Sequence, residues 1–284
     1  MAFDVHQAVT DKIIATMEAG EAGQWTYPWH RTGGGLPRNA LTGRPYRGIN
    51  VLSLWVGAQA SGYSDDRWAT YRQWAELGAQ VRKGERSTLV VFFKEYEDAY
   101  GEDRKRFVAR ASYAFNAAQC EGAPEAGEPL PASEWNLSAV FDGFVERTGA
   151  IVIPGGDMAC YLPAQDLIRI PSRTRFPTAH GYASTMGHEL THWSGAKGRL
   201  DRDLTGRFKS RAYAAEELVA ELGSAFLMAE LGLEAEPHPT RASYIRSWIK
   251  LLRSDPKAIF TAASAASRAV GYLTALQSRM AEAA

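Results

Sequence analysis

Residues 186–193 read MGHELTHW, in which two histidines stand four positions apart and a glutamate directly follows the first. Side chains at this spacing share one face of an α-helix, so His188 and His192 would present their imidazoles to the same side. The neighbouring residues supply an apolar side to this helix, no proline interrupts it, and Gly195 offers a stop. The sequence therefore predicts a helix that ends near Trp193 and carries two imidazoles on one face.

Two imidazoles on one helix face predict a metal site. Zinc binds imidazole nitrogen, and a catalytic zinc site has three protein ligands and one position open for water. Glu189 lies on a neighbouring part of the helix surface, from which it can reach that water without binding the metal, as in His-Glu-x-x-His hydrolases. Because zinc lowers the pKa of bound water from about 15.7 to roughly 7, a carboxylate can take its proton. We expect His188 and His192 as ligands and Glu189 as general base, with Zn²⁺ or another divalent metal bound.

A later helix offers the third ligand. The stretch YAAEELVAELGSAFLMAELG, residues 213–232, has an apolar stripe with Glu217 and Glu221 four positions apart beside it. Carboxylates in such a place cost several kcal/mol to bury unless they are paired or bind a cation. We expect Glu217 to be the third ligand and Glu221 to be the hydrogen-bond partner of a ligand histidine. Glu216 could replace Glu217, and a solvated helix surface is the alternative for all three.

A residue that stabilises negative charge in a transition state is harder to assign. Tyr213 stands one turn before Glu217 and could offer its hydroxyl to a developing oxyanion. His180 and His238 are alternatives, and a structural role is an alternative for each of the three.

The pattern of elements predicts an α+β chain of two domains. Expected helices cover 5–17, 49–60, 137–147, the motif stretch, 212–231 and two stretches from 240 onward; expected strands cover 87–96, 106–116, 150–154, 159–163 and 166–171. The stretch EGAPEAGEPLPAS holds three prolines, three glutamates and one large apolar residue, which is typical of a linker. We therefore expect an α+β domain over 1–124, an acidic linker over 125–134, and a mainly helical domain with a small sheet over 135–284.

Aromatic and basic residues alternate in the front half, where five of the eight tryptophans lie between residues 24 and 74. Stacking of a base on an aromatic ring contributes about 1–3 kcal/mol, and arginines bind phosphates, so this composition indicates single-strand binding. The loop TGRPYRGIN places Tyr46 between two arginines. Tyr46 and Trp29 are candidates for stacking. For the other large aromatics, Trp55, Trp68 and Trp74, core packing is favoured.

Charge agrees with this interpretation. The chain has 32 basic and 32 acidic residues, but residues 22–119 hold 14 basic against 9 acidic ones. Residues 121–146 hold six acidic residues and no basic one. A basic front half indicates a polyanionic partner, although an uneven solvated surface would look the same.

Other classes of protein find no support in the sequence. Cys120 and Cys160 stand forty positions apart, without the spacing of a disulfide framework or a cysteine-based zinc site. No Walker-type glycine-rich loop occurs, so nucleotide hydrolysis is not indicated. The first residues lack the features of a signal peptide, and no apolar run of 18 residues occurs. We expect a soluble cytoplasmic protein without a membrane partner.

Six stretches resemble the antirestriction family ArdC and together span almost the whole chain. They are PRNALTGRPYRGINVLSLW, GAQVRKGERSTLVVFFK and SYAFNAAQCEG in the front, and ACYLPAQDLIRIP, HGYASTMGHELTHWSGAKGRLDR and YAAEELVAELGSAFL in the back. The resemblance implies a front domain that binds single-stranded DNA, shared with TraC-type plasmid primases, and a zincin-like metallopeptidase domain behind it. It also implies protection of incoming plasmid DNA from the recipient's restriction enzymes during conjugation, and it puts the family's glutamate-bearing helix on EELVAE.

The predicted partners are single-stranded DNA and a protein, either a peptide substrate or a restriction enzyme. The candidate DNA contacts, taken from the basic and aromatic residues and from these stretches, are Trp29, Arg38, Asn39, Arg44, Tyr46, Arg47, Asn50, Lys83 and Arg86. Two other functions remain open: a protein that only coats DNA and keeps its metal for stability, and an intracellular peptidase whose front half recognises protein.

Overall fold

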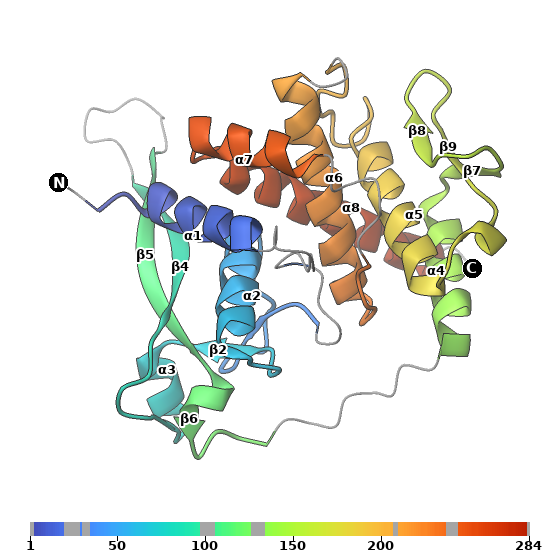
Figure 1. The fold of residues 1–284 in the computed structure, drawn as a ribbon. Coiled ribbons are helices and arrows are strands. Elements are labelled where there is room, and N and C mark those ends of the chain that lie inside the picture. Colours follow the sequence, from blue (N-terminus) through green and yellow to red (C-terminus); the bar gives the residue numbers. More distant parts are fainter. Residues whose placement is uncertain are drawn as a thin grey trace.

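The computed structural model describes residues 3–19, 29, 35–96, 106–125, 134–206, 210–236 and 244–282. The front part, residues 3–125, contains α1 (Val5–Ala19), β1 (Arg38–Asn39), α2 (Ile49–Ser61), β2 (Arg67–Ala69), α3 (Tyr71–Glu76), β3 (Gln80–Val81), β4 (Thr88–Tyr96), β5 (Arg106–Asn116) and β6 (Cys120–Glu121). The back part, residues 134–282, contains α4 (Glu134–Thr148), β7 (Ile151–Pro154), β8 (Cys160–Leu162), β9 (Leu167–Ile170), α5 (Ala179–Ser194), α6 (Arg211–Glu230), α7 (Ile245–Ser254) and α8 (Ala258–Glu282). Figure 1 shows the β4–β5 ribbon at one end of the molecule, α6 and α8 near the centre, and β7, β8 and β9 at the other end.

The sheet of the front part is built around one long hairpin. The two runs rich in β-branched and aromatic residues form β4 and β5, which pair antiparallel from Thr88 opposite Ala114 to Tyr96 opposite Arg106. Two short strands extend the order to β1-β2-β5-β4, with β1 parallel to β2 and β2 antiparallel to β5. The predicted hairpin is confirmed, whereas β1 and β2 have only two and three residues, too few for a periodic signal.

Helix α2 covers the outer edge of β4. The side-chain amide of Asn50 donates to the carbonyl oxygen of Val91 at 2.8 Å and accepts from the N–H of the same residue at 2.7 Å. One turn later, Ser53 donates to the carbonyl oxygen of Leu89. An unpaired strand edge is a template for association with another chain, and α2 removes this hazard with side-chain hydrogen bonds.

In the back part, two helices approach each other closely. A Cβ atom placed on Gly223 of α6 would lie 2.5 Å from the side chain of Thr191 on α5, so only glycine allows this approach. A three-stranded sheet of order β7-β9-β8 packs on α5, with β8 antiparallel and β7 parallel to β9. The short distance between α5 and α6 therefore allows side chains on the two helices to contact one another.

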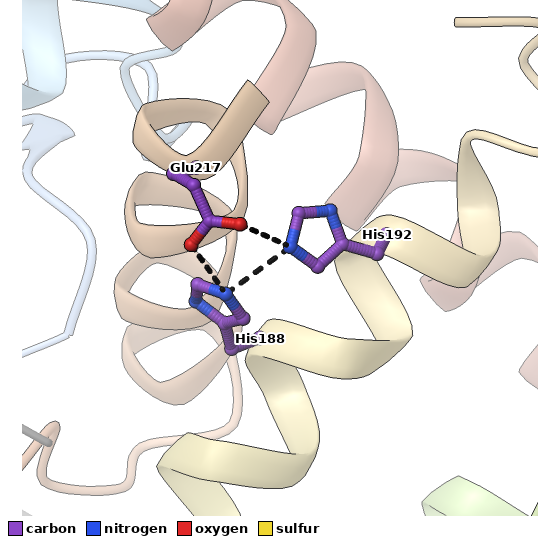
Figure 2. A group of neighbouring side chains, drawn as sticks. All are labelled: His188, His192 and Glu217. Atoms are coloured by element: carbon purple, nitrogen blue, oxygen red, sulfur yellow. Dashed lines mark hydrogen bonds and ion pairs between the residues drawn. The ribbon is translucent and has the colours of Figure 1, made fainter. Parts of the chain in front are cut away.

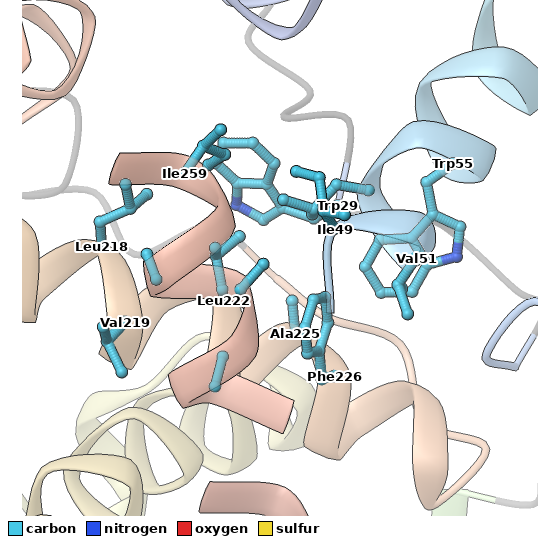
Figure 3. Close-up of a cluster of buried hydrophobic side chains, with 14 of the residues drawn as sticks. Trp29, Ile49, Val51, Trp55, Leu218, Val219, Leu222, Ala225, Phe226 and Ile259 are labelled. Carbon is cyan, nitrogen blue, oxygen red and sulfur yellow. The ribbon is translucent and has the colours of Figure 1, made fainter. Parts of the chain in front are cut away.

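The two parts share one hydrophobic core. Trp29, Ile49 and Trp55 of the front part belong to the same buried cluster as Phe226 of α6 and Ile259 of α8, and Figure 3 shows these side chains in one layer between the helices. The ring of Trp55 meets that of Phe226 edge to face, with centroids 5.6 Å apart. The domain boundaries at 124 and 135 stay predictions, but the described residues of the two parts bury each other's apolar surface.

The predicted α+β class, with a mainly helical back part and a small sheet, is confirmed. Trp55, Trp68 and Trp74 are at most 2% exposed, as core packing predicts. Within the described ranges, no helix is both long and apolar enough to cross a membrane.

Candidate metal centre

Helix α5 carries the two histidines as its sequence predicts. Thr178 caps the helix by accepting a hydrogen bond from the N–H of Gly181, and the opposite side is buried through Met186 and Leu190. The Nε2 atoms of His188 and His192 lie 3.2 Å apart. Both rings therefore point to one place beside the helix.

Glu217 reaches the same place from α6. Its two carboxylate oxygens lie 3.6 Å from Nε2 of His188 and 3.6 Å from Nε2 of His192, and Figure 2 shows the three side chains facing one another. Ligand atoms about 2.0–2.2 Å from a tetrahedral zinc ion are roughly 3.3–3.6 Å apart, so the observed spacing fits a cation among the three groups. These side chains form the one such cluster of histidine, cysteine and acidic groups found among the described residues.

Each imidazole has a second carboxylate behind it. Nδ1 of His192 lies 3.2 Å from a Glu216 oxygen, and Nδ1 of His188 lies 3.8 Å from a Glu221 oxygen. Such carboxylates fix the orientation and tautomer of a ligand histidine and raise its basicity. Glu221 lies beside His188, but 3.8 Å is longer than a hydrogen bond, so its role as the hydrogen-bond partner of this histidine stays a prediction. Glu216, the alternative third ligand, lies behind His192 rather than between the two Nε2 atoms.

Arg202 is a supporting residue that sequence reasoning missed. Its guanidinium pairs with Glu216 at 3.0 Å and donates to the carbonyl oxygen of Thr191 and the hydroxyl of Ser194. A Cβ atom on Gly195 would lie 2.7 Å from this guanidinium, so this glycine does more than end the helix. The arginine follows the motif by ten residues, and no periodicity or known spacing marks it.

Glu189 is held by the edge strand β8. One of its carboxylate oxygens accepts a hydrogen bond from the N–H of Tyr161 at 2.7 Å. Two contacts link this strand to α5. The hydroxyl of Tyr161 donates a hydrogen bond to the carboxylate of Asp166, and Arg199 pairs with the same carboxylate. The guanidinium of Arg199 in turn lies 4.0 Å from the centre of the Trp193 ring on α5. The general-base candidate is therefore 6% exposed and tied to the backbone of a neighbouring strand.

Tyr213 lies on the Glu217 side of the centre. Its hydroxyl is 3.1 Å from that of Tyr244. Burial, the hydrogen bond with Tyr244 and the charge of Glu217 all raise the pKa of Tyr213, so the phenol keeps its proton and can donate it in a hydrogen bond. Of the two alternatives, His180 lies two turns before His188 near the start of α5, and His238 lies outside the described residues.

Neighbouring charged side chains shift the pKa values of two proposed ligands, His192 and Glu217. Burial alone lowers the pKa of His192, but Glu216 and Glu217 outweigh it and raise the pKa to about 10. Burial alone raises the pKa of Glu217, but His188 and His192 outweigh it and hold the pKa well below its usual range. The site is thus arranged to hold positive charge, which a proton or a metal ion can supply.

The predicted DNA contacts divide into two groups. The exposed group consists of basic side chains, Arg38, Arg44, Arg47, Lys83 and Arg86. Arg38 forms an ion pair of 3.1 Å with Asp66, which neutralises part of its charge. Exposed arginine and lysine side chains can bind phosphate groups.

The other predicted contacts are engaged in the fold, which corrects their assignment. Trp29 is 1% exposed in the shared core, so its ring offers no face to a base. Asn50 is buried, and both the NH₂ and the carbonyl oxygen of its side chain are hydrogen-bonded to the backbone of Val91. Asn39 donates to the hydroxyl of the 9% exposed Tyr46 and accepts from two backbone N–H groups of the following turn. Asn39 and Tyr46 therefore shape the loop that carries Arg44.

A helix bearing His-Glu-x-x-His, with a glutamate supplied by the next helix, is the arrangement of zincin-like metallopeptidases, and residues 139–265 match the family described as zincin-like metallopeptidase. Residues 3–120 match the family described as the N-terminal domain of anti-restriction factor ArdC. The chain therefore belongs to the ArdC antirestriction family.

Relatives and solved structures agree with this assignment. The chain is 45% identical to protein y4eC of Sinorhizobium fredii, over 97% of this chain and 93% of that protein. It resembles the crystal structure of the antirestriction protein ArdC from plasmid R388 in its metal-free form, with 40% identity, a TM-score of 0.82 and coverage of 98% and 99% of the two chains. The Mn(II)-bound structure of that protein gives 38% identity, a TM-score of 0.80 and coverage of 97% and 98%.

Two DNA primases TraC of Escherichia coli are 38% identical to the chain. The similarity covers 96% of this chain, so it includes the metallopeptidase-like part as well as the front domain expected to be shared. The chain spans only 20% and 27% of the length of these primases.

Proposed function

We propose that this chain is an antirestriction protein of the cytoplasm that binds single-stranded DNA and protects incoming plasmid DNA from restriction during conjugation. We further propose that His188, His192 and Glu217 hold a divalent metal, either zinc or manganese. The observation that carries the proposal is the convergence of these three side chains, two from α5 and one from α6, within a chain of the ArdC family. Because this centre is of the metallopeptidase type, we also propose that the substrate is a protein, which could be the restriction enzyme itself.

The residues around the metal have distinct roles in peptide hydrolysis. A bound metal would polarise the scissile carbonyl group and acidify a water molecule. Glu189, fixed by the N–H of Tyr161, takes the proton of that water and passes it to the leaving amine. Tyr213 keeps its phenolic proton and donates a hydrogen bond to the developing oxyanion.

Glu189→Gln separates hydrolysis from metal binding. Glutamine keeps the oxygen that accepts from Tyr161 but cannot take a proton, so we expect normal metal content and a loss of peptidase activity of about 10²-fold or more. His188→Ala and Glu217→Ala should lose the metal as measured by elemental analysis. Full peptidase activity of Glu189→Gln would remove the hydrolytic role, and full metal retention by both alanine variants would remove the ligand assignment.

Binding of single-stranded DNA is tested by titration at several salt concentrations. Affinity that depends on phosphate contacts falls steeply with salt, with a logarithmic slope of about −0.7 per phosphate. Arg44→Ala and Arg47→Ala should each weaken binding and make the slope shallower by roughly one contact. An undetectable or salt-independent interaction would favour the peptidase whose front part recognises protein.

The shared core supports a second candidate function, a DNA-coating protein with a structural metal. Because Leu218, which directly follows Glu217, lies in the core that also holds Trp55, a metal on α6 would stabilise residues of both parts. Full-length Glu189→Gln decides between the two functions, since isolated halves would expose this core. Protection of DNA from a restriction enzyme by Glu189→Gln at the wild-type level favours coating, and loss of protection with unchanged DNA affinity favours hydrolysis.

A further inference from the structure

A cavity of about 300 Å³ lies where the front part meets α6 and α8. The turn after β1 forms one wall through Arg47, α6 contributes Phe226 and Glu230, and α8 contributes Gly271 and Thr274. This volume is at the lower end of the range of small-ligand sites, about 300–1,000 Å³. None of these residues takes part in the metal centre.

The cavity is a fixed feature of the junction. The N–H of Gly48 donates to the hydroxyl of Ser267 on α8 at 2.8 Å, which holds the arginine-bearing turn against that helix. The guanidinium of Arg47 lies above Gly271, because a Cβ atom there would be 3.9 Å from Nη1. The exposed arginine therefore stands at the mouth of the cavity while the turn behind it is anchored.

The walls combine apolar surface with a few polar groups. Val51, Phe226 and Val270 supply apolar surface. The hydroxyl oxygen of Thr274 is buried and has no hydrogen-bond partner among the described residues. Glu230, at the end of α6, adds an exposed carboxylate. A buried hydroxyl without a partner is unfavourable in a protein interior, and a rotation about χ1 would turn it toward a ligand in the cavity, which would then be bound preferentially.

We infer that this cavity takes a nucleobase with an exocyclic amino group from a bound single strand, while Arg47 binds an adjoining phosphate. The inference rests on the proposed binding of single-stranded DNA. A base offers apolar faces to the walls and a polar edge to Thr274. Carboxylates accept hydrogen bonds from amino groups such as N4 of cytosine, so Glu230 favours an amino-bearing base over thymine, and it opposes a phosphate in the same place.

Gly271→Leu tests the cavity by filling it. This glycine has an ordinary helical backbone, and the only atom within 4 Å of an added Cβ is the mobile end of Arg47. The variant should therefore keep or raise the wild-type melting temperature, because glycine is a poor helix former, and bind a cytosine oligonucleotide roughly tenfold more weakly, since the base no longer fits in the cavity. Thr261→Leu, an exposed position on the same helix, is the matched control and should bind like the wild type.

Thr274→Val gives a second, independent test. Valine has the shape of threonine without the hydroxyl, and that hydroxyl bonds no described residue, so the melting temperature should stay the same or rise. DNA affinity should nevertheless fall about threefold. The wild type should prefer oligo-dC to oligo-dT, and Glu230→Met should remove this preference.

The outcomes separate the inference from the function on which it rests. If the wild type binds no single strand, both are overturned. If the wild type binds with steep salt dependence while Gly271→Leu and Thr274→Val bind equally well, only the inference is overturned. Binding of free deoxycytidine monophosphate that Gly271→Leu abolishes, without any change in oligonucleotide affinity, would assign the cavity to a free nucleotide and overturn its role in strand binding.

Discussion

At the scale of single residues, carboxylates decide what the proposed metal centre can do. His188 and His192 each have an acidic side chain behind the ring, and Glu217 lies between them. The acid behind His192 is in turn paired with Arg202. A metal that binds here would therefore depend on residues that do not touch it.

Glu216→Gln should weaken metal binding by about 10–100-fold, the usual effect of losing a carboxylate behind a ligand histidine. The variant leaves the three proposed ligands intact but removes the charge that orients His192 and leaves Arg202 without its ion pair. Isothermal titration with Zn²⁺ or Mn²⁺ measures the effect, with exposed Glu230→Gln on the same helix as control. Equal affinities of the two variants would show that Glu216 does not position the ligand.

Metal affinity should rise with pH up to about pH 10. The pKa of His192 is raised to about 10, so the imidazole carries a proton at neutral pH that must leave when a metal binds. Glu217, whose pKa is lowered, is already ionised and adds no pH dependence in this range. The dissociation constant should therefore fall by up to about tenfold per pH unit between pH 7 and 9. Calorimetry in buffers of different ionisation enthalpy should detect the released proton, and a pH-independent affinity would contradict the assignment.

At the scale of helices and strands, the chain was partly predictable from its sequence. The spacing of His188 and His192, the acids of α6 and the runs that form β4 and β5 follow from local periodicity, and each lies in the predicted kind of element. Contacts between distant segments had no such signal. The bond from Tyr161 to Glu189 and the pairing of Arg202 with Glu216 join residues 28 and 14 positions apart, and only tertiary packing specifies them.

The same limit explains the wrong assignments in the front part. Trp29 was predicted to bind DNA because its ring is aromatic, and Asn50 because it lies in a stretch that resembles the ArdC family, but neither signal reveals which side chains the core needs. Trp29 fills the junction between the two parts, and Asn50 closes the edge of β4. Arg44 and Arg47 lie in the same loop and remain exposed, because an unpaired guanidinium is costly to bury.

The contact between α5 and α6 should be sensitive to one methyl group. Gly223→Ala would place a Cβ atom 2.5 Å from the side chain of Thr191 and force the helices apart. We expect a loss of about 1–3 kcal/mol in the free energy of unfolding, and weaker metal binding because Glu217 moves with α6. Gly271→Ala is the control, since its Cβ has room and the change should stabilise the helix by about 0.5–1 kcal/mol. Equal stability of both variants in urea unfolding would mean that the close approach is not required.

At the scale of the whole molecule, the shared core should make the two parts one folding unit. Trp55 of α2 packs on Phe226 of α6, and Thr10 of α1 donates a hydrogen bond to the carbonyl oxygen of Pro256 before α8. Truncation of a buried tryptophan typically costs about 3–5 kcal/mol, so neither part can lose the other without a large penalty. The proposed DNA surface lies on the front part and the proposed metal centre on the back part, and both depend on the same hydrophobic core.

A metal bound to the back part should therefore protect the front part from unfolding. A ligand at 100 times its dissociation constant stabilises the folded state by about 2.7 kcal/mol, and in a single cooperative unit this applies to every element. Hydrogen exchange measured by mass spectrometry should slow in the β4–β5 hairpin on addition of Zn²⁺ or Mn²⁺, to the same extent as in α6, for amides that exchange only by global unfolding. His188→Ala should abolish the effect in both elements. Protection confined to α5 and α6 would show that the parts unfold separately, and the front part could then act on DNA without regard to the metal.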